Sequence, residues 1–382
     1  MMKTWQVFIQ FLLLGCTSFG GPAAHLAYFR ERFVTRLAWL NEERYAQFVA
    51  LSQFLPGPGS SQVGFAVGYH QAGLPGAIAA FVGFTTPSFL IMHAVFVFGQ
   101  SQYSVLTGIT QGLKLLAVVV VLDAVVGMFR NFCTNRYYIA VCVATAVLMS
   151  FIGGVVIQFI VLLLVAVLGA MFAGAAKSGS SPALRPNITA LILFIAGLVV
   201  FPFAAASNEM FALLNSFYQS GSMVFGGGHV VLPLLQATVG DAIPDDRFLM
   251  AYGAAQAIPG PMFSLAAFLG AELYSAKPLL GAVLALVAIF TPGLLLMLAL
   301  QNTWQNLNTL PRIMAASATV NAAVVGLLLA ALYKPVMVSS IDSWSAALAA
   351  GIAYGVLVKY RPPIIMLVAA FAVFGVLLQY IS

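Results

Sequence analysis

Long apolar stretches, separated by short polar ones, run through the whole chain. Their hydrophobic positions are continuous rather than alternating, which predicts helices rather than the strands of a β-barrel. Most of the stretches are long enough to enter or cross a bilayer. In the first half they are 4–19, 22–36 (amphipathic), 45–70, 74–98, 105–128, 137–152 and 155–173, and in the second half 188–204, 208–225, 228–240, 247–271, 278–301, 312–333, 343–358 and 363–380.

The composition makes the chain an integral membrane protein. Of its 382 residues, 62% are hydrophobic and 7% are charged, whereas a soluble domain carries about 25% charged residues. We therefore expect an all-α polytopic bundle whose surroundings are the lipid bilayer. The net charge of +6 is what basic cytoplasmic loops give such a protein. No basic cluster is interleaved with aromatic residues, so we expect no nucleic-acid partner.

The second half of the sequence repeats the first at a shift of about 205 residues. TSFGGPAAH matches MVFGGGHVV, QFLPGPGSS matches QAIPGPMFS, and LPGAIAAF matches LLGAVLAL. Landmarks in the same order at a nearly constant offset predict an internal duplication. The expected division is a first repeat at 1–176, a linker with one unpaired helix at 177–206, and a second repeat at 207–382.

One extra crossing between the copies would turn the second copy upside down, and the loop charges agree with this. The basic loop of the first copy and the acidic loop of the second carry Arg30, Arg32, Arg36 and Arg44 against Asp241, Asp245 and Asp246. Because Lys and Arg collect on the cytoplasmic side, these loops belong on opposite faces. We expect inverted repeats with re-entrant hairpins at 4–36 and 45–70, a cytoplasmic N-terminus and a C-terminus on the opposite side of the membrane.

Breaks rich in glycine and proline interrupt the apolar stretches at equivalent places in the two repeats. In transporters such breaks expose half-helix N-termini and freed backbone groups to the substrate, although a single break is equally well explained as a kink. The candidate substrate-binding residues are Gly20, Gly21, His25, Gln53, Pro56, Gly57, Pro58, Gly59, Ser60, Ser61 and Gln62 in the first repeat, and Gly226, Gly227, Gly228, His229, Gln256, Pro259, Gly260, Pro261 and Ser264 in the second.

Two cations complete the candidate site. Lys114 lies well inside an apolar stretch, where a charge is a functional candidate, although its ammonium could instead snorkel to the interface. Arg30 either attracts an anion at the cytoplasmic mouth or anchors to lipid headgroups. Asp123 lies nearer the end of its stretch and is interpreted as an interface residue, with proton coupling as the alternative.

The breaks offer hydroxyls, amides, imidazoles and backbone N–H groups, and no carboxylate stands beside them in the sequence. A donor-rich site of this kind suits an oxyanion, because backbone N–H groups at helix N-termini bind anions. The three cysteines show no metal spacing, and no nucleotide-binding motif is present. We therefore expect neither a metal nor a cofactor, and not an enzyme.

The motifs FGGPAAHLAYFR, QFLPGPGSSQ and GLPGAIAAFVGFTTPSFL resemble the first half of the chromate ion transporter family. FGGGHVVLP and QAIPGPMFSLAAFLG resemble its second half, so the resemblance spans nearly the whole chain in the long, two-domain form. The resemblance implies export of chromate from the cytoplasm across a bacterial inner membrane, which gives chromate resistance and makes the outer side, with the C-terminus, periplasmic. The second copy departs from the motif at Gly228, which replaces a proline, and at Val231, which matches His25.

Other transport modes stay open at the level of the sequence. Sulfate is a tetrahedral dianion like chromate, so a sulfate or other oxyanion exchanger is one alternative, and a passive anion channel is another. A homodimer is compatible with the sequence. Without a nucleotide-binding motif, energy has to come from ion gradients, exchange or the membrane potential.

Overall fold

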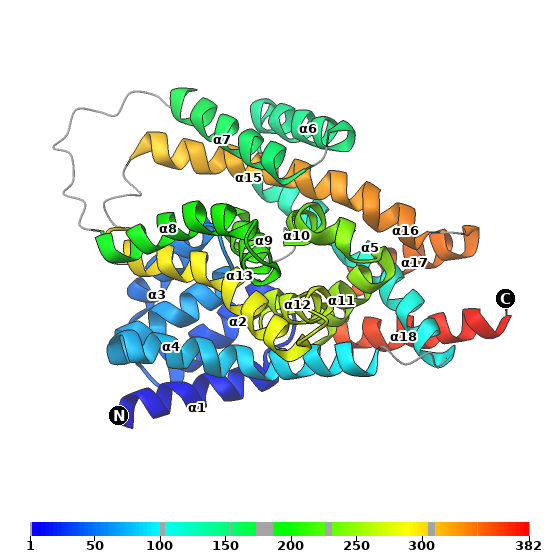
Figure 1. The fold of residues 1–382 in the computed structure, drawn as a ribbon, viewed down its shortest axis with the longest axis horizontal. Helices are drawn as coiled ribbons and strands as arrows, with labels where there is room; N and C mark the ends of the chain where they lie inside the picture. Colours follow the sequence, from blue (N-terminus) through cyan, green and yellow to red (C-terminus); the bar gives the residue numbers. More distant parts are fainter. Residues whose placement is uncertain are drawn as a thin grey trace.

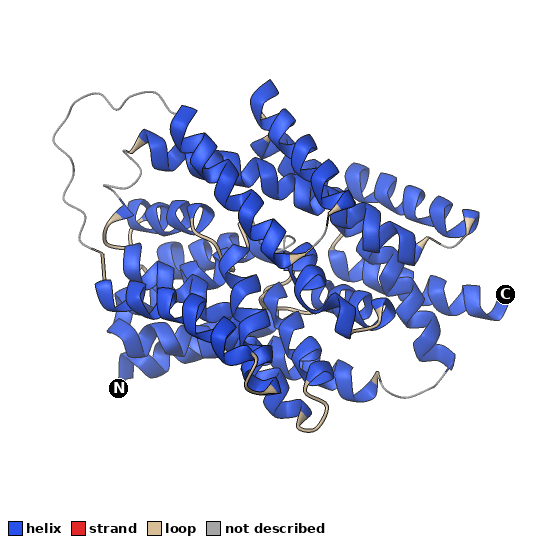
Figure 2. Ribbon diagram, turned by 45° about the horizontal axis from the view of Figure 1, so that its top comes forward, coloured by secondary structure: helices blue, strands red, loops and turns tan. Residues whose placement is uncertain are grey.

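The computed structural model describes residues 2–99, 104–152, 154–172, 186–225, 231–304, 310–341 and 343–381, and it contains helices without any strand in these ranges (Figure 2). The expected all-α membrane protein is confirmed. The first half comprises α1 (Met2–Thr17), α2 (Gly21–Arg30), a π-helical turn (Glu31–Arg36), α3 (Glu42–Phe54), α4 (Gly59–Phe98), α5 (Ser104–Phe132), α6 (Arg136–Phe151) and α7 (Val155–Phe172).

The second half follows an equivalent order after one additional helix, α8 (Ile188–Ala205). Among the described residues, the further α-helices are α9 (Glu209–Met223), α10 (Val231–Val239), α11 (Asp245–Ala257), α12 (Leu265–Leu273), α13 (Pro278–Leu300), α15 (Pro311–Ala331), α16 (Val338–Ser340), α17 (Trp344–Tyr360) and α18 (Ile364–Ile381). Short turns of 3₁₀-helix (Gly240–Ala242, Met262–Ser264) and π-helix (Leu332–Met337) lie between them.

Helix α4 is two helices joined by a sharp turn. Ala72 and Gly73 leave the helical region, with Gly73 at φ +62°. The chain folds back there so tightly that a Cβ on Gly68 would collide with the carbonyl of Gly76. This turn divides α4 where the hydrophobic pattern ends one predicted stretch and begins the next.

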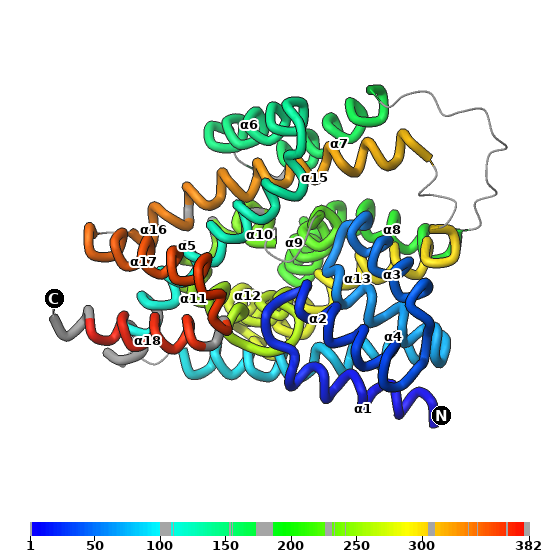
Figure 3. Tube along the Cα trace, turned by 180° about the vertical axis from the view of Figure 1, so that it is seen from behind, coloured from blue at the N-terminus to red at the C-terminus, as the bar shows by residue number. Residues whose placement is uncertain are grey.

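Helices of the two halves are interleaved in the bundle. α5 packs against α18 and α17, whereas α15 packs against α6 and α7, as Figure 1 and the reverse view in Figure 3 show. The main core cluster draws on helices from both halves, and a second cluster joins α1–α4 to the end of α13. Neither half therefore buries its apolar faces alone.

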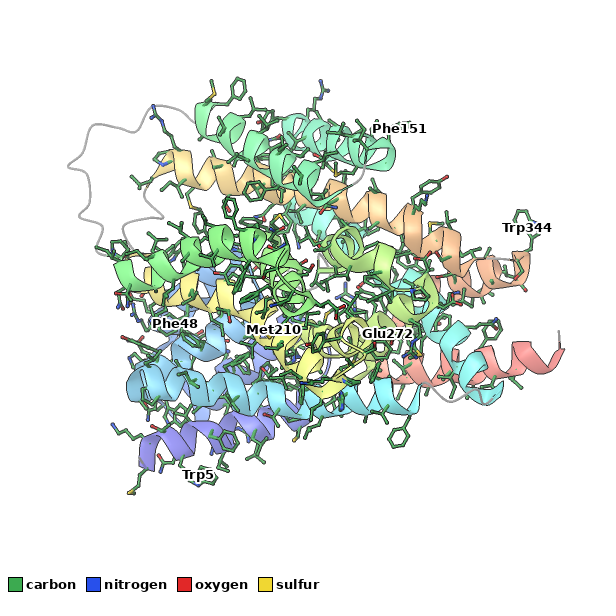
Figure 4. The ribbon with its side chains drawn as sticks, in the orientation of Figure 1. Trp5, Phe48, Phe151, Met210, Glu272 and Trp344 are labelled. Carbon is green, nitrogen blue, oxygen red and sulfur yellow. The ribbon has the colours of Figure 1, made fainter. Side chains whose placement is uncertain are left out.

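Large apolar side chains cover much of the outside. Trp5, Phe151 and Trp344 are 63%, 84% and 92% exposed and lie at the edges of the molecule in Figure 4. Exposed apolar surface on this scale requires a lipid environment. Within the described residues, five helical ranges are long and apolar enough to cross a bilayer: Gly59–Phe98, Gln111–Phe132, Ile188–Ala205, Pro278–Leu300 and Pro311–Ser340.

Candidate substrate cavity

The first glycine motif starts a helix. Gly20 adopts a left-handed conformation (φ +99°) as the N-cap of α2, and Gly21 also has a positive φ of +76°. Pro22 occupies the first turn, where its missing N–H would have had no intrahelical partner. The other N–H groups of this turn lie at the positive end of the α2 dipole. The sequence prediction of a half-helix beginning at this motif is met.

The second proline motif separates α11 from α12. Gly260 has φ +92°, and its N–H donates a hydrogen bond of 2.9 Å to the carbonyl of Ser18 at the end of α1. A Cβ on Gly260 would lie 3.0 Å from Ser88 Oγ. Ser264 Oγ, one helical turn further on, is 2.6 Å from the same hydroxyl. The break of the second half is therefore held against α1 and α4 of the first half.

A cavity of about 140 Å³ opens where these two breaks meet. At about 30 Å³ per water molecule, this is room for a few waters or one small ion. The lining joins the start of α2 to the end of α11 and to one face of α5, with Leu357 of α17 beside them. The residues are Gly20, Gly21, Val120, Asp123, Ala255, Gln256, Ile258, Gly260, Met262 and Leu357.

The first proline motif lies apart from this cavity and is fixed by bonds to the second half. The N–H of Gly57 (φ +123°) donates to the carbonyl of Val224 at 2.6 Å, the counterpart of the Gly260–Ser18 bond. Gln62 Nε2 donates to the carbonyls of Pro56 and Gly293 at 2.9 and 3.0 Å. Each break is thus hydrogen-bonded to the helix end that precedes the glycine motif of the other half.

His25 ties the two breaks of the first half together. Its imidazole is 1% exposed. Nδ1 lies 3.2 Å from Ser60 Oγ, and Nε2 lies 3.2 Å from the carbonyl oxygen of Ser18. The ring also packs edge-on against Phe84. With both nitrogens engaged, His25 positions α2 against α4 and does not line the cavity.

Both predicted cations are engaged in ion pairs. Arg30 Nε bonds Glu42 at 2.6 Å on an exposed surface, and this hydrogen bond raises the pKa of Arg30. Lys114 Nζ lies 2.6 Å from Asp246, and the lysine side chain is only 15% exposed. Neither residue lines the cavity.

The structure brings together four of the residues singled out in the sequence, namely Gly20, Gly21, Gln256 and Gly260. Gln53 is exposed on α3, and Ser61 and Pro58 are buried at the first proline motif. Four further candidates, Gly226, Gly227, Gly228 and His229, lie outside the described residues.

Asp123 belongs to the cavity although sequence analysis favoured an interface role. The signal that could have found it is the presence of a carboxylate within an apolar stretch, since such residues are rare and face cavities or partners. Within the described residues, no group of three or more His, Cys, Asp or Glu side chains could hold a metal ion.

These features define a class: a polytopic helical membrane protein with broken helices that converge on a small polar cavity. The family model described as "Chromate transporter" matches residues 5–175 and again residues 211–376. The chain belongs to the chromate transporter family.

Three relatives show how far the similarity extends. A chromate transport protein of Cupriavidus metallidurans is 27% identical over 387 residues, covering 93% of this chain and 88% of the relative. A chromate transport protein of Pseudomonas aeruginosa is 25% identical over 353 residues (85% and 79%). An uncharacterized transporter of Methanocaldococcus jannaschii is 25% identical over 309 residues (77% and 75%). No solved structure gives a significant match.

Proposed function

We propose that this protein is a secondary transporter that exports chromate from the cytoplasm across the bacterial inner membrane and so gives chromate resistance. The observation that carries the proposal is the cavity in which the start of α2 meets the Gly260 break. The family and the names of the relatives from Cupriavidus metallidurans and Pseudomonas aeruginosa support chromate as the substrate.

The chemistry of the cavity suits a small oxyanion. Backbone N–H groups at a helix start carry partial positive charge and donate to anions. Glycines at 20, 21 and 260 leave the backbone uncovered where an oxygen atom would approach. Gln256 adds an amide to the lining. A tetrahedral anion with four acceptor oxygens can use several such donors at once.

Energy for export can come from the membrane potential. Moving one charge across 100 mV is worth about 2.3 kcal/mol, so a dianion that leaves a negative interior unaccompanied gains about 4.6 kcal/mol. The sequence contains no P-loop, which favours gradients over nucleotide hydrolysis as the energy source.

We further propose that the halves 1–176 and 207–382 are inverted repeats, with 177–206 as a linker that contains the unpaired helix α8. The bonds Gly57–Val224 and Gly260–Ser18 support this, because Gly57 is equivalent to Gly260 and Val224 to Ser18, so the same contact is made in both directions between the halves. In such transporters the substrate lies where the repeats meet, and alternating access moves one repeat against the other.

The test is uptake of labelled chromate into inverted membrane vesicles, which present the cytoplasmic face outward. We expect uptake that depends on the protein and increases when the vesicle interior is made positive, since this drives the dianion inward. If charge and tetrahedral shape dominate recognition, sulfate and molybdate, both tetrahedral dianions, should compete more strongly than phosphate, which is protonated near neutral pH. Uptake equal to that of vesicles lacking the protein would refute the proposed function, and sulfate uptake without chromate uptake would reassign the substrate.

A further inference from the structure

Asp123 is a carboxylate that lines the candidate cavity and lies near the middle of a helix that is long and apolar enough to cross a bilayer. It stands on α5, within the candidate span Gln111–Phe132. At a rise of about 1.5 Å per residue, it lies about 18 Å from Gln111 and about 14 Å from Phe132 along the helix axis. The same cavity lining holds Gly20 and Gly21 at the start of α2 and Gly260 at the opposite break. An oxyanion bound by those glycines would be a neighbour of this side chain.

The carboxylate has no ion-pair or hydrogen-bond partner among the described residues. This sets it apart from Glu42, Asp246 and Glu272, each of which pairs with a cation. Asp123 is also exposed and lines the cavity, through which a proton can reach it. An intramembrane acid that is unpaired, accessible and next to a binding site is typical of a proton-carrying group.

Other titratable groups lie on the elements around the cavity. The helices and turns packed on α5 are α11, α15, α16, α17, α18 and the turn Leu332–Met337. Together with α2 and α5 itself they carry His25, Tyr28, Arg30, Lys114, Arg130, Asp245, Asp246, Arg247, Tyr252, Arg312, Tyr333, Lys334, Tyr354, Lys359, Tyr360 and Tyr380. Leaving aside Tyr380, whose side chain is not described, none of these lines the cavity.

We propose that Asp123 must be protonated for the oxyanion to bind, so that one proton crosses the membrane in the same direction as each dianion. An ionised carboxylate would repel a dianion in the same cavity, whereas a protonated one is neutral and donates an O–H to an anion oxygen. Binding of the anion and of the proton therefore favour each other. This inference rests on the proposed function and adds the identity of its coupling ion.

The proposal fixes the charge moved in each cycle. A dianion accompanied by one proton carries a net charge of −1 instead of −2. The position equivalent to Asp123 at a shift of 205 residues is Leu328, so the other half supplies no second carboxylate at this point. One proton per anion is the expected ratio.

The experiment measures the reversal potential of labelled chromate flux in proteoliposomes at fixed pH. For a tenfold chromate gradient, net chromate flux through the wild-type protein should be zero at a membrane potential of about 59 mV, the value for one transported charge. Two transported charges would give about 30 mV instead. A tenfold proton gradient should shift the wild-type balance by a further 59 mV or so. Replacing a sodium gradient by choline should change neither value.

The variant Asp123→Asn mimics the protonated carboxyl and cannot release a proton. This variant should retain exchange of labelled for unlabelled chromate. The reversal potential of any net flux should lie at the two-charge value and should not respond to the proton gradient. Asp123→Glu should restore the one-charge value. Glu209→Gln, which neutralises an exposed carboxylate at the start of α9, is the matched control and should behave as wild type.

Three results would overturn the inference. The first is a wild-type reversal potential at the two-charge value. The second is a one-charge reversal potential that Asp123→Asn retains, since the proton would then travel on the anion itself. The third is loss of exchange in Asp123→Asn when detergent-purified protein is correctly folded. Wild-type protein that exchanges no chromate would contradict the proposed function as well, whereas these three results leave that function standing.

Discussion

Gly260 is the residue at which backbone geometry and the cavity coincide. Its φ of +92° lies in a region that side chains disfavour, and its N–H is bonded to Ser18. Gly57 is its counterpart in the first half, with φ +123° and no room for a Cβ, which would lie 2.8 Å from the Cα of Gly293. Both positions therefore require glycine for the backbone path of the break.

At the residue scale, we predict that Gly260→Ala strongly reduces chromate transport while the protein still reaches the membrane. The left-handed backbone costs an alanine about 1–2 kcal/mol, and the added Cβ presses on Ser88 of α4, which would displace the break that lines the cavity. Uptake per amount of folded membrane protein is the measurement. The control is Gly351→Ala on α17, where a Cβ meets nothing within 4 Å and activity should be retained. Equal activity of both variants would contradict the role of Gly260.

Lys114 and Asp246 define a second prediction at the residue scale. Because the ammonium pairs with Asp246, Lys114→Gln and Asp246→Asn should have similar, small effects on stability. Lys114 is only 15% exposed but Asp246 is 70% exposed, so solvent at the carboxylate screens the pair, and we expect a contribution near the upper end of the about 0–1 kcal/mol of exposed pairs. The double variant should be no worse than either single one, measured by thermal unfolding and chromate uptake. If Lys114 instead holds the substrate, as the sequence suggested, Lys114→Gln alone would abolish uptake.

The breaks are the functional elements of the fold, and the first proline motif tests their importance. Pro56 and Pro58 separate α3 from α4, and proline prevents a helix from continuing through this point. The side chain of Gln62 then occupies the gap, bonding carbonyls of Pro56 and Gly293. A continuous helix would remove these bonds and the Gly57–Val224 link to the other half.

At the element scale, we predict that the double variant Pro56→Ala, Pro58→Ala loses most chromate resistance in a chromate-sensitive host. The restored N–H groups favour a continuous helix, which would pull the two halves out of register. Pro202→Ala is the matched control, since Pro202 lies inside α8 away from the breaks and its removal should leave resistance intact. Survival is to be compared at equal amounts of membrane protein. Full resistance of the double variant would reduce the break to a simple kink.

At the scale of the whole molecule, the arrangement of the two halves decides how the cavity is reached. The break of each half is hydrogen-bonded to the other half, through the Gly57–Val224 and Gly260–Ser18 bonds. Helices α5 and α15 each pack on helices of the opposite half. A motion of one half would therefore act directly on the lining of the cavity.

We predict that single cysteines at the two equivalent loops react from opposite sides of the membrane. Thr35→Cys should be labelled by an impermeant thiol reagent only from the cytoplasm, and Ala242→Cys only from outside, because the loop charges have opposite bias. Both positions are exposed. The background needs Cys16, Cys133 and Cys142 replaced by serine, with retained transport as the control. Labelling of both from the same face would refute the inverted arrangement.

The sequence was sufficient for the local features. Continuous apolar runs fixed the helices, because a backbone in lipid has to satisfy its own hydrogen bonds. Glycine and proline fixed the breaks at positions 20–22, 56–59 and 259–261, because their backbone preferences act within a few residues. The near-constant offset of the motifs also predicted that equivalent elements would recur in the second half.

Only the tertiary structure decided which breaks face each other. It joined Gly20 and Gly21 to Gly260 across some 240 positions of sequence, left the first proline motif outside the cavity, and added Asp123 from α5. It also paired Lys114 with Asp246 and His25 with Ser60. The physical reason is that local preference determines where a helix starts and stops. The neighbour of each helix depends on close packing of small residues and on hydrogen bonds between distant segments, which no spacing in the sequence records.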